Sequence, residues 1–281
     1  MRFAFLVIIF LSFSISVFAG DTRNIGIQTF TFSKLTIEEL LPLVKQCGCD
    51  AVGMSRHRLS KKFPDVFVSP DMTTEQKEFL KKILSENKIK VVSYGVVTPT
   101  NEKSIRKLFE FAKEFDVKII LAEPRPEKLE LWNKLCGEYN MKVAVHNHAK
   151  NAKRNPEFYN PKFVADMIAK YPNVYACADT GHWGRSGIDC VQGIKTLKDK
   201  HAILHFRDIN KSDLSAFDVP IGTGALNAKQ MLAELDSQNF NGYLLLEYGG
   251  WWKNTLEQKI EDENFCRKFN LKNLITNKTQ R

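Results

Sequence analysis

The sequence predicts an α/β fold, a single (β/α)₈ barrel, on three observations. Eight short apolar runs typical of β-strands alternate with eight amphipathic stretches typical of α-helices, in one unbroken series. The chain left after an N-terminal leader, about 260 residues, has the usual size of one such barrel, although two smaller domains would also fit that length. No linker rich in proline, glycine or serine divides it.

The first predicted strand argues against an open, doubly wound sheet, which is the main alternative. Such a sheet usually carries a glycine-rich phosphate-binding turn after its first strand. Here the strand runs into Gln28-Thr29-Phe30-Thr31-Phe32, without glycine. The eight strand candidates are residues 25–30, 51–55, 90–97, 118–123, 142–146, 174–179, 202–206 and 242–247.

Residues 1–19 have the pattern of a cleaved secretory signal peptide. Arg2 precedes a largely apolar run, and the small residue Ala19 suits a cleavage point before Gly20. A retained membrane anchor is the alternative, but the run is short for a bilayer span. We therefore expect a mature barrel of residues 20–281, exported to the periplasm and not attached to the membrane.

Helix patterns lie between the predicted strands, and two of them carry clear start signals. Thr36 is a candidate N-cap with acidic residues in the first turn, and Thr73 and Gln76 have the spacing of a capping box. The helix candidates are residues 36–47, 73–87, 101–115, 127–139, 160–170, 189–198, 227–238 and 255–271.

One long irregular segment, residues 207–226, separates the seventh strand from the seventh helix. It contains Gly222-Thr223-Gly224. A loop of this length in a compact domain is more often functional than accidental. We expect it to fold over the mouth of the barrel.

Charge and cysteine content exclude little on their own. The formal net charge of +9 falls to +8 when Arg2 leaves with the leader, which could suit nucleic acid or an anionic substrate. The basic residues are scattered over helix patterns, however, so we interpret them as a solvated surface. The six cysteines are too sparse for a disulfide scaffold, and Cys47 and Cys49 are only a weak metal motif without a second pair. We expect most of the thiols to be free.

Histidines gather where the predicted strands end. Only His201 lies at a strand start. The carboxyl ends of barrel strands meet at one mouth, where catalytic groups sit. Scattered histidines would not sort in this way, so the sequence predicts a site at the mouth. The histidines at or just after strand ends are His57, His146, His148, His182 and His205.

Two carboxylates at the same ends predict a metal site. Asp179 and Glu247 each close an apolar run, where an unpaired carboxylate would be costly and a cation would remove that cost. Alone, each residue has a plainer explanation, since strand-end histidines are often structural and Asp179 could cap a helix or turn. Carboxylate and imidazole ligands together suit Mn²⁺, Zn²⁺, Fe²⁺ or Co²⁺. The candidate ligands are His146, Asp179, His205 and Glu247.

Other side chains at the predicted mouth suit a sugar. Histidines there could bind substrate hydroxyls or hold a ligand carboxylate, and the apolar face of a sugar ring stacks on aromatic rings. Packing between loops is the alternative for the aromatics. Besides Phe30, Tyr94 and Trp252 at the rim, the candidates for substrate contact are His57, His148, His182, Trp183, Arg207 and Trp251.

These motifs resemble the xylose-isomerase-like TIM barrel superfamily, and within it the sugar phosphate isomerase/epimerase type. The resemblance covers essentially the whole mature chain. The matching stretches are residues 119–124, Val145-His146-Asn147-His148, Ala178-Asp179-Thr180-Gly181-His182-Trp183, Leu204-His205-Phe206-Arg207-Asp208, Gly222-Thr223-Gly224 and Leu246-Glu247-Tyr248.

The resemblance implies a divalent metal held by Glu, Asp, His and Glu from strands five to eight. Asp179, His205 and Glu247 match the last three positions, and His146 stands in place of the first glutamate. In the superfamily, glutamates from strands five and eight move a proton beside a carbonyl. With His146 at that position, Glu123 on strand four could supply the missing carboxylate, as a ligand or as the base.

The function that follows is a metal-dependent sugar isomerase or epimerase. We expect Glu123, His146 or Glu247 to remove a proton next to the carbonyl of a sugar or keto-sugar. A lyase or hydratase acting on oxidised glycosides is the alternative. An endonuclease IV-like phosphodiesterase and a non-catalytic sugar-binding barrel are the other classes. Because of the export signal, we expect an unphosphorylated carbohydrate as the partner and no nucleic acid, and the sequence leaves a homo-oligomer open.

Overall fold

The computed structural model describes residues 23–153, 155–249, 260, 261 and 264. The predicted signal peptide, Trp251, Trp252, Cys266 and nearly all of the predicted helix at 255–271 lie outside the described residues.

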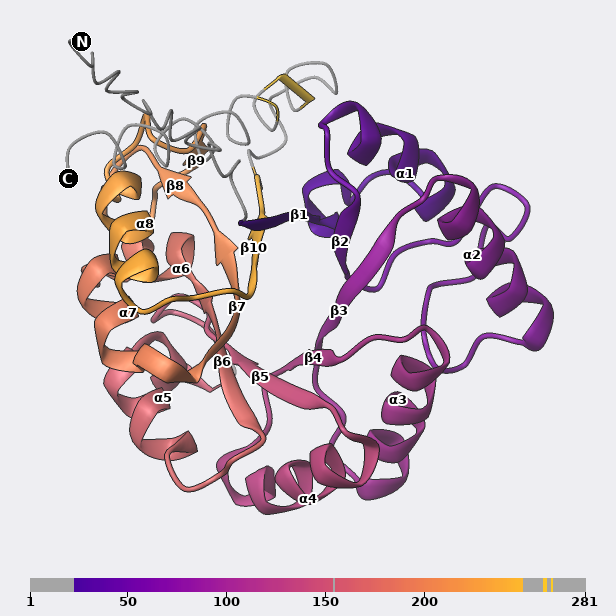
Figure 1. Cartoon of the computed structure of the whole chain (residues 1–281), viewed down its shortest axis with the longest axis horizontal. Helices are drawn as coiled ribbons and strands as arrows, with labels where there is room; N and C mark the ends of the chain where they lie inside the picture. Colours follow the sequence, from indigo (N-terminus) through magenta and orange to yellow (C-terminus); the bar gives the residue numbers. More distant parts are fainter. Residues whose placement is uncertain (1–22, 154, 250–259, 262–263, 265–281) are drawn as a thin grey trace, which may run out of the picture.

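Eight parallel strands close into one barrel, which confirms the predicted fold. Around the barrel they follow the order β1-β10-β7-β6-β5-β4-β3-β2, and the helices form an outer ring (Figure 1). The barrel strands are β1 (Asn24–Gln28), β2 (Ala51–Met54), β3 (Lys90–Val97), β4 (Ile119–Ala122), β5 (Lys142–His146), β6 (Val174–Asp179), β7 (His201–Phe206) and β10 (Tyr243–Leu246).

An apolar layer contributed by the strands sets the position of the polar residues above it. Its members pack as one buried cluster that includes Leu121, Ala144, Cys177, Ile203 and Leu245. Side chains two residues apart point to the same face of a strand. The next inward-facing positions toward the carboxyl ends are therefore Glu123, His146, Asp179, His205 and Glu247.

The helices bury their apolar faces against the outside of the barrel, in a second core that includes Phe109 and Trp132. Thr36 and Thr73 both form capping boxes, with Glu39 and Gln76, so both predicted helix starts are confirmed. The helices are α1 (Ile37–Gln46), α2 (Thr74–Glu86), α3 (Glu102–Glu114), α4 (Leu129–Tyr139), α5 (Pro161–Ile168), α6 (Thr180–Arg185), α7 (Cys190–Leu197) and α8 (Ala228–Ser237). The four 3-10 helices are η1 (Thr29–Phe32), η2 (Pro126–Lys128), η3 (Pro156–Tyr159) and η4 (Lys198–Lys200).

Two local elements differ from the sequence prediction. The first strand ends at Gln28 rather than at residue 30, and η1 follows it directly. The short helix α6 begins at Thr180 because the Asp179 side chain accepts a hydrogen bond from the His182 backbone N–H and caps it. That cap lies inside the stretch expected to bear chemistry.

The segment 207–226 forms a small hairpin of β8 (Asp208–Ile209) and β9 (Asp218–Val219). The buried Asp208 carboxylate organises the turn beyond it, and it accepts hydrogen bonds from the backbone N–H groups of Ile209, Gly222, Gly224 and Leu226. A side chain at Gly224 would collide with this carboxylate and with the Ile209 carbonyl. Gly224 is therefore required for close approach of the backbone to Asp208.

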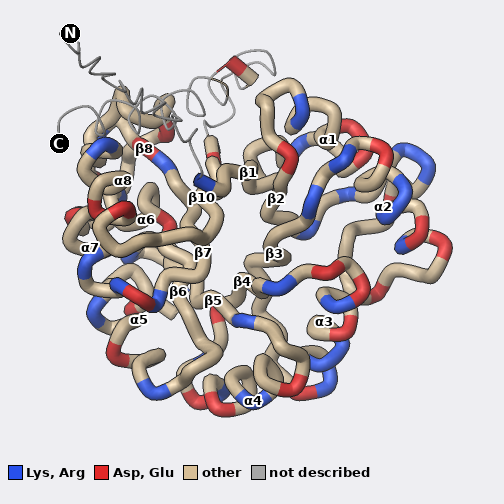
Figure 2. Tube along the Cα trace, in the orientation of Figure 1, with Lys and Arg blue, Asp and Glu red and all other residues tan. Residues whose placement is uncertain are grey.

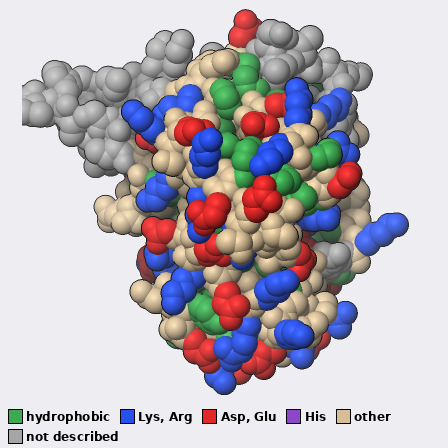
Figure 3. All heavy atoms as spheres, turned by 90° about the vertical axis from the view of Figure 1, so that its right-hand side faces the viewer, with side chains coloured by type: hydrophobic (Ala, Val, Ile, Leu, Met, Phe, Trp, Pro, Cys, Tyr) green, Lys and Arg blue, Asp and Glu red, His purple; other side chains and the backbone are tan. Residues whose placement is uncertain are grey.

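The outer surface carries charges of both signs. Lysine and arginine alternate with aspartate and glutamate along the outer helices (Figure 2), and the face in Figure 3 shows the same mixture. Several of these charges form exposed ion pairs, such as Lys162 with Asp166 in α5. Among the residues that the structure describes, no helix is long and apolar enough to cross a bilayer.

Candidate active site

A cavity of about 820 Å³ opens at the carboxyl ends of the strands. This volume lies within the usual range of small-molecule sites. Residues 214–217 of the loop also line it, as predicted for a segment folded over the mouth. The predicted site residues on the cavity wall are Glu123, His146, His148, His182, His205, Arg207 and Glu247.

Asp179 is the buried centre of the polar cluster. Its Oδ2 lies 3.6 Å from His146 Nε2, 3.7 Å from His205 Nδ1 and 3.8 Å from His182 Nε2. Its Oδ1 accepts the backbone N–H of His182 at 2.8 Å. One carboxylate oxygen therefore faces three imidazoles.

Arg207 joins Asp179 to Glu247. Its Nη1 donates to Asp179 Oδ2 at 3.1 Å and to Glu247 Oε1 at 2.9 Å, and its Nε and Nη2 donate to Asp218. All three guanidinium nitrogens are thus engaged by carboxylates. Arg207 lies on the cavity wall as predicted, but the contacts seen are with the acids of the site.

The arginine keeps two buried acids ionised. Burial raises the pKa of Asp179, but Arg207 and His182 outweigh it and hold that pKa well below its usual range. Burial likewise raises the pKa of Glu247, while Arg207 and His205 bring it down to about 2. Both groups are therefore negatively charged at neutral pH.

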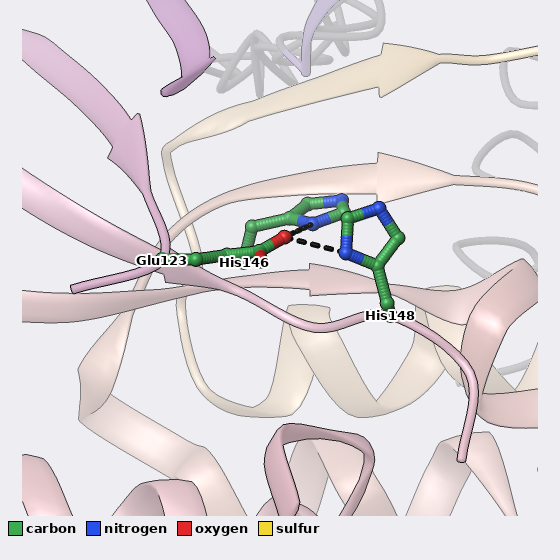
Figure 4. Close-up of side chains that lie close together, drawn as sticks. All are labelled: Glu123, His146 and His148. Carbon is green, nitrogen blue, oxygen red and sulfur yellow. Dashed lines mark ion pairs between the residues drawn. The ribbon is translucent and has the colours of Figure 1, made fainter. Parts of the chain in front are cut away.

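Glu123 lies between two histidines, as Figure 4 shows. Its Oε1 lies 2.5 Å from His148 Nδ1 and 3.6 Å from His146 Nδ1. Burial raises the pKa of Glu123, but these two histidines outweigh it and lower the pKa to about 2. Burial lowers the pKa of His146, but Asp179 and Glu123 outweigh it and raise the pKa to about 9.

The donor set fits a divalent cation. His146 belongs to two groups of three candidate ligands, and within each group the ligand atoms lie within 4.8 Å of one another. Nδ1 of His146 and Nδ1 of His205 are buried and face carboxylates, at 3.6 Å from Glu123 Oε1 and 3.0 Å from Glu247 Oε2. Buried nitrogens of this kind next to carboxylates are typical of a metal site. The two groups are Glu123 with His146 and His148, and His146 with Asp179 and His205.

Gln28, which the sequence analysis did not single out, supports His205 from the side opposite Asp179. Its Nε2 lies 3.1 Å from His205 Nε2, and its Oε1 accepts the Thr29 backbone N–H at 3.1 Å. In this orientation the amide donates to Nε2, so the ring proton lies on Nδ1, which is 3.0 Å from Glu247 Oε2. The alternation of side chains along the first strand could have identified Gln28. Gln28 lies two residues beyond Gly26, which faces the inside of the barrel.

Two aromatic residues predicted at the mouth are buried away from the cavity. Trp183 is 1% exposed, because its position one residue after His182 in α6 turns the indole toward Gly193 in α7. Tyr94 donates its hydroxyl to the Val68 carbonyl. The prediction that Trp183 contacts substrate is therefore wrong for this arrangement.

His57 also lies behind the cavity wall rather than on it. The ring is 4% exposed, and its Nδ1 lies 3.0 Å from the hydroxyl of Ser55, which does line the cavity. The prediction of direct substrate contact by His57 is thus corrected. Phe30 is on the cavity wall as expected, and Trp251 lies outside the described residues.

Sequence reasoning missed Ser55, Arg185 and Asp218. Ser55 follows the inward-facing Gly53 by two residues, so the alternation could have found it. Asp218 has no such signal, because it reaches Arg207 and Arg185 only through the hairpin.

Comparison with known proteins gives relatives of two activities. An inosose dehydratase from Clostridium perfringens is 28% identical over 153 residues, which cover 47% of this chain and 50% of the relative. The chain thus spans about half the length of the curated relatives it matches. An L-ribulose 3-epimerase has the same fold, with a TM-score of 0.69 at 14% identity over 92% of this chain and 96% of that one.

A solved structure and a family model cover far more of the sequence. An uncharacterised protein from Parabacteroides distasonis superposes with a TM-score of 0.70 at 27% identity, over 89% of this chain and 99% of that one. Residues 41–267 match the model of the xylose isomerase-like TIM barrel family. Because this match spans most of the chain and the strands close into the expected barrel, the protein belongs to the xylose isomerase-like TIM barrel family.

Proposed function

We propose that this protein is a metal-dependent enzyme that isomerises or epimerises a sugar or keto-sugar by moving a proton next to a carbonyl. The observation that carries the proposal is the position of His146. Its Nε2 faces Asp179 and its Nδ1 faces Glu123. The imidazole therefore lies between the candidate metal ligands around Asp179 and the pair of Glu123 and His148.

The cation would be held by His146, Asp179, His205 and Glu247. Bound there, a divalent metal supplies polarisation of a substrate carbonyl and acidifies the adjacent C–H bond. Glu123 lies on the far side of the His146 ring from Asp179. A carboxylate in that place orients a ligand histidine and raises its basicity.

His148 is the group best placed to take the proton. Its side chain is 42% exposed on the cavity wall, whereas the side chain of Glu123 is 3% exposed and is held by two histidines. With Nδ1–H donated to Glu123, Nε2 is the accepting nitrogen. Glu123 then stabilises the imidazolium that forms, as a carboxylate does behind a catalytic histidine. Proton return to the opposite face of the same carbon gives an epimer, and return to the neighbouring carbon gives an isomer.

A lyase is the second candidate, because the Glu123–His148 pair can donate a proton as well as accept one. Protonated His148 could assist the departure of a β-hydroxyl or β-glycosidic group after the first proton transfer. The similarity to an inosose dehydratase favours this outcome. For both candidates we propose an exported protein and an unphosphorylated substrate, on the basis of the signal-like segment 1–19.

Exchange of the C–H proton beside the carbonyl with solvent tests the proposal, because isomerisation, epimerisation and elimination all begin with loss of that proton. Metal-loaded protein is incubated in D₂O with a panel of ketoses, aldoses and keto-glycosides, and deuterium beside the carbonyl is followed by NMR. We expect exchange in the wild type and a rate at least ~100-fold lower in His148→Gln. Lys150→Ala, an exposed change two residues on, is the matched control and should keep the wild-type rate.

The products separate the candidates, since elimination yields an enone with ultraviolet absorbance and isomerisation does not. A wild type that exchanges no C–H in the whole panel would refute the proposed function. Full exchange by His148→Gln would remove His148 from the mechanism.

A further inference from the structure

A second group of hydrogen-bonded polar side chains lies at the part of the cavity wall next to β1 and β2. Ser55 lies just after β2 and lines the cavity, and its Oγ is 3.0 Å from His57 Nδ1. The other ring nitrogen, Nε2, is 3.3 Å from the Phe32 carbonyl. The Ser55 hydroxyl, the His57 imidazole and the Phe32 carbonyl are thus connected by two successive hydrogen bonds.

The backbone carbonyl determines which nitrogen carries the proton. A carbonyl oxygen only accepts, so His57 Nε2 must be the donor to Phe32. Burial lowers the pKa of His57, which keeps the ring neutral. A neutral ring with its proton on Nε2 has a lone pair on Nδ1. Two hydroxyls lie near that lone pair, and Ser55 Oγ at 3.0 Å is nearer than Thr29 Oγ1 at 3.4 Å, so Ser55 is the donor.

Thr29 completes the hydrogen-bond arrangement around Ser55. Its Oγ1 accepts the Ser55 backbone N–H at 2.9 Å and lies 3.0 Å from Ser55 Oγ. With the Ser55 proton directed to His57, the Thr29 hydroxyl donates to Ser55 Oγ. A hydroxyl oxygen has two acceptor positions, so one remains for a ligand in the cavity. That position suits a hydrogen-bond donor, and in a carbohydrate the donor is a hydroxyl group.

We propose that Ser55 is a further catalytic residue that accepts the proton of a substrate hydroxyl and passes its own proton to His57. In this step the substrate O–H bond breaks and a new O–H bond forms at Ser55. The former Ser55 proton forms an N–H bond at His57 Nδ1. The products are a substrate alkoxide, a neutral Ser55 and a His57 imidazolium, so protons and charge balance. His57 is a positioning residue, since it does not touch the cavity, and it holds the proton only transiently because burial disfavours its imidazolium.

The relay predicts which reaction the site performs, and in this respect it rests on the proposed function. Epimerisation beside a carbonyl moves only a C–H proton. Moving the carbonyl along the chain also requires a neighbouring hydroxyl to lose its proton. A site with a C–H base at His148 and an O–H acceptor at Ser55 therefore suits an aldose–ketose type of isomerisation.

Two variants test the relay against a purely structural role. Ser55→Ala removes the hydroxyl, and His57→Asn keeps an acceptor near the place of Nδ1 but takes up no proton at neutral pH. We expect both variants to keep C–H exchange in D₂O within a few-fold of wild type and to lose carbonyl migration by ~100-fold or more. Ser69→Ala, which alters a serine between β2 and α2 whose hydroxyl accepts the Asp71 N–H, should leave both rates unchanged.

The outcomes separate the two proposals. Carbonyl migration at the wild-type rate in Ser55→Ala would overturn the relay and leave the proposed function in place. A wild type without C–H exchange refutes the proposed function instead. The hydrogen bond itself is tested by ¹⁵N NMR of the histidine rings, where we expect a proton on Nε2 of His57 and a shift of the Nδ1 resonance in Ser55→Ala. A proton found on Nδ1 would overturn the relay for any substrate.

Discussion

His146 meets a carboxylate at each of its two ring nitrogens, and these contacts favour a histidine over a glutamate at this position. A glutamate at this position would lie between Asp179 and Glu123, and three buried negative charges would repel one another. An imidazole there contacts both acids favourably, at 3.6 Å on each side. At the residue scale, the His146 imidazole therefore stabilises the acids on both sides of it.

The tautomer of His205 gives a prediction at the same scale. In the arrangement seen, the Gln28 amide donates to Nε2 and leaves the proton on Nδ1, the nitrogen nearest Asp179 and Glu247. A carboxylate in place of the amide could only accept, so Nε2 would carry the proton and Nδ1 would be free for a cation. We expect Gln28→Glu to raise the affinity for Mn²⁺ by about tenfold or more, as measured by isothermal titration calorimetry.

Gln46→Glu is the control for added negative charge, because Gln46 is exposed at the end of α1. It should leave the affinity unchanged. An unaltered or weaker affinity in Gln28→Glu would show that His205 does not bind the cation through Nδ1.

At the element scale, the hairpin of β8 and β9 brings distant charges to the site. Asp218 in β9 holds the outer side of Arg207, whose Nη1 holds Asp179 and Glu247. Two exposed apolar residues of the same loop, Leu214 and Phe217, lie on the cavity wall. The loop therefore supplies the Asp218 carboxylate that holds Arg207 in place, and it also supplies part of the cavity wall.

Asp208 is the residue on which this loop depends. Its carboxylate accepts four backbone N–H groups, and an asparagine would turn an NH₂ group toward some of those donors. We expect Asp208→Asn to lower the free energy of unfolding by about 2–3 kcal/mol, measured in urea at pH 7. Hydrogen exchange of residues 209–226 should also become faster.

Asp213→Asn, at an exposed position of the same loop, serves as the control and should change stability by less than ~1 kcal/mol. Loop exchange at the wild-type rate in Asp208→Asn would contradict the role given to Asp208.

The barrel was predictable because each strand carries its own apolar signal, and the strand-end polar residues follow from side-chain alternation. The same rule would have found Gln28 and Ser55, which lie two residues beyond Gly26 and Gly53. It could not find Asp218, since that contact depends on the hairpin geometry. Nor could it show that Trp183 turns away from the mouth, because that orientation depends on the short helix α6, which the strand pattern does not predict.

At the scale of the whole molecule, the cation site should couple to stability. Buried Asp179 and Glu247 carry negative charge that Arg207 compensates only in part, so a bound cation favours the folded chain. We expect Mn²⁺ at about 100 times its Kd to raise the free energy of unfolding by roughly 2.7 kcal/mol, measured by denaturant titration with and without chelator.

Asp179→Asn should abolish this gain while preserving the cap of α6, since its side-chain oxygen can still accept the His182 N–H. Wild-type stability that does not respond to Mn²⁺, Zn²⁺, Co²⁺ or Fe²⁺ would contradict the metal site.

The contacts of Gln28 and Thr29 also bear on how the site is assembled as the chain folds. Gln28 reaches His205 in the second half of the sequence, and Thr29 reaches Ser55 and His57 in the first half. β1 is synthesised before the other strands, and it must pair with β10, which is the last of them. Neither half of the barrel alone therefore contains a complete site. The ability to bind a ligand should therefore appear only after β1 pairs with β10 and the barrel closes.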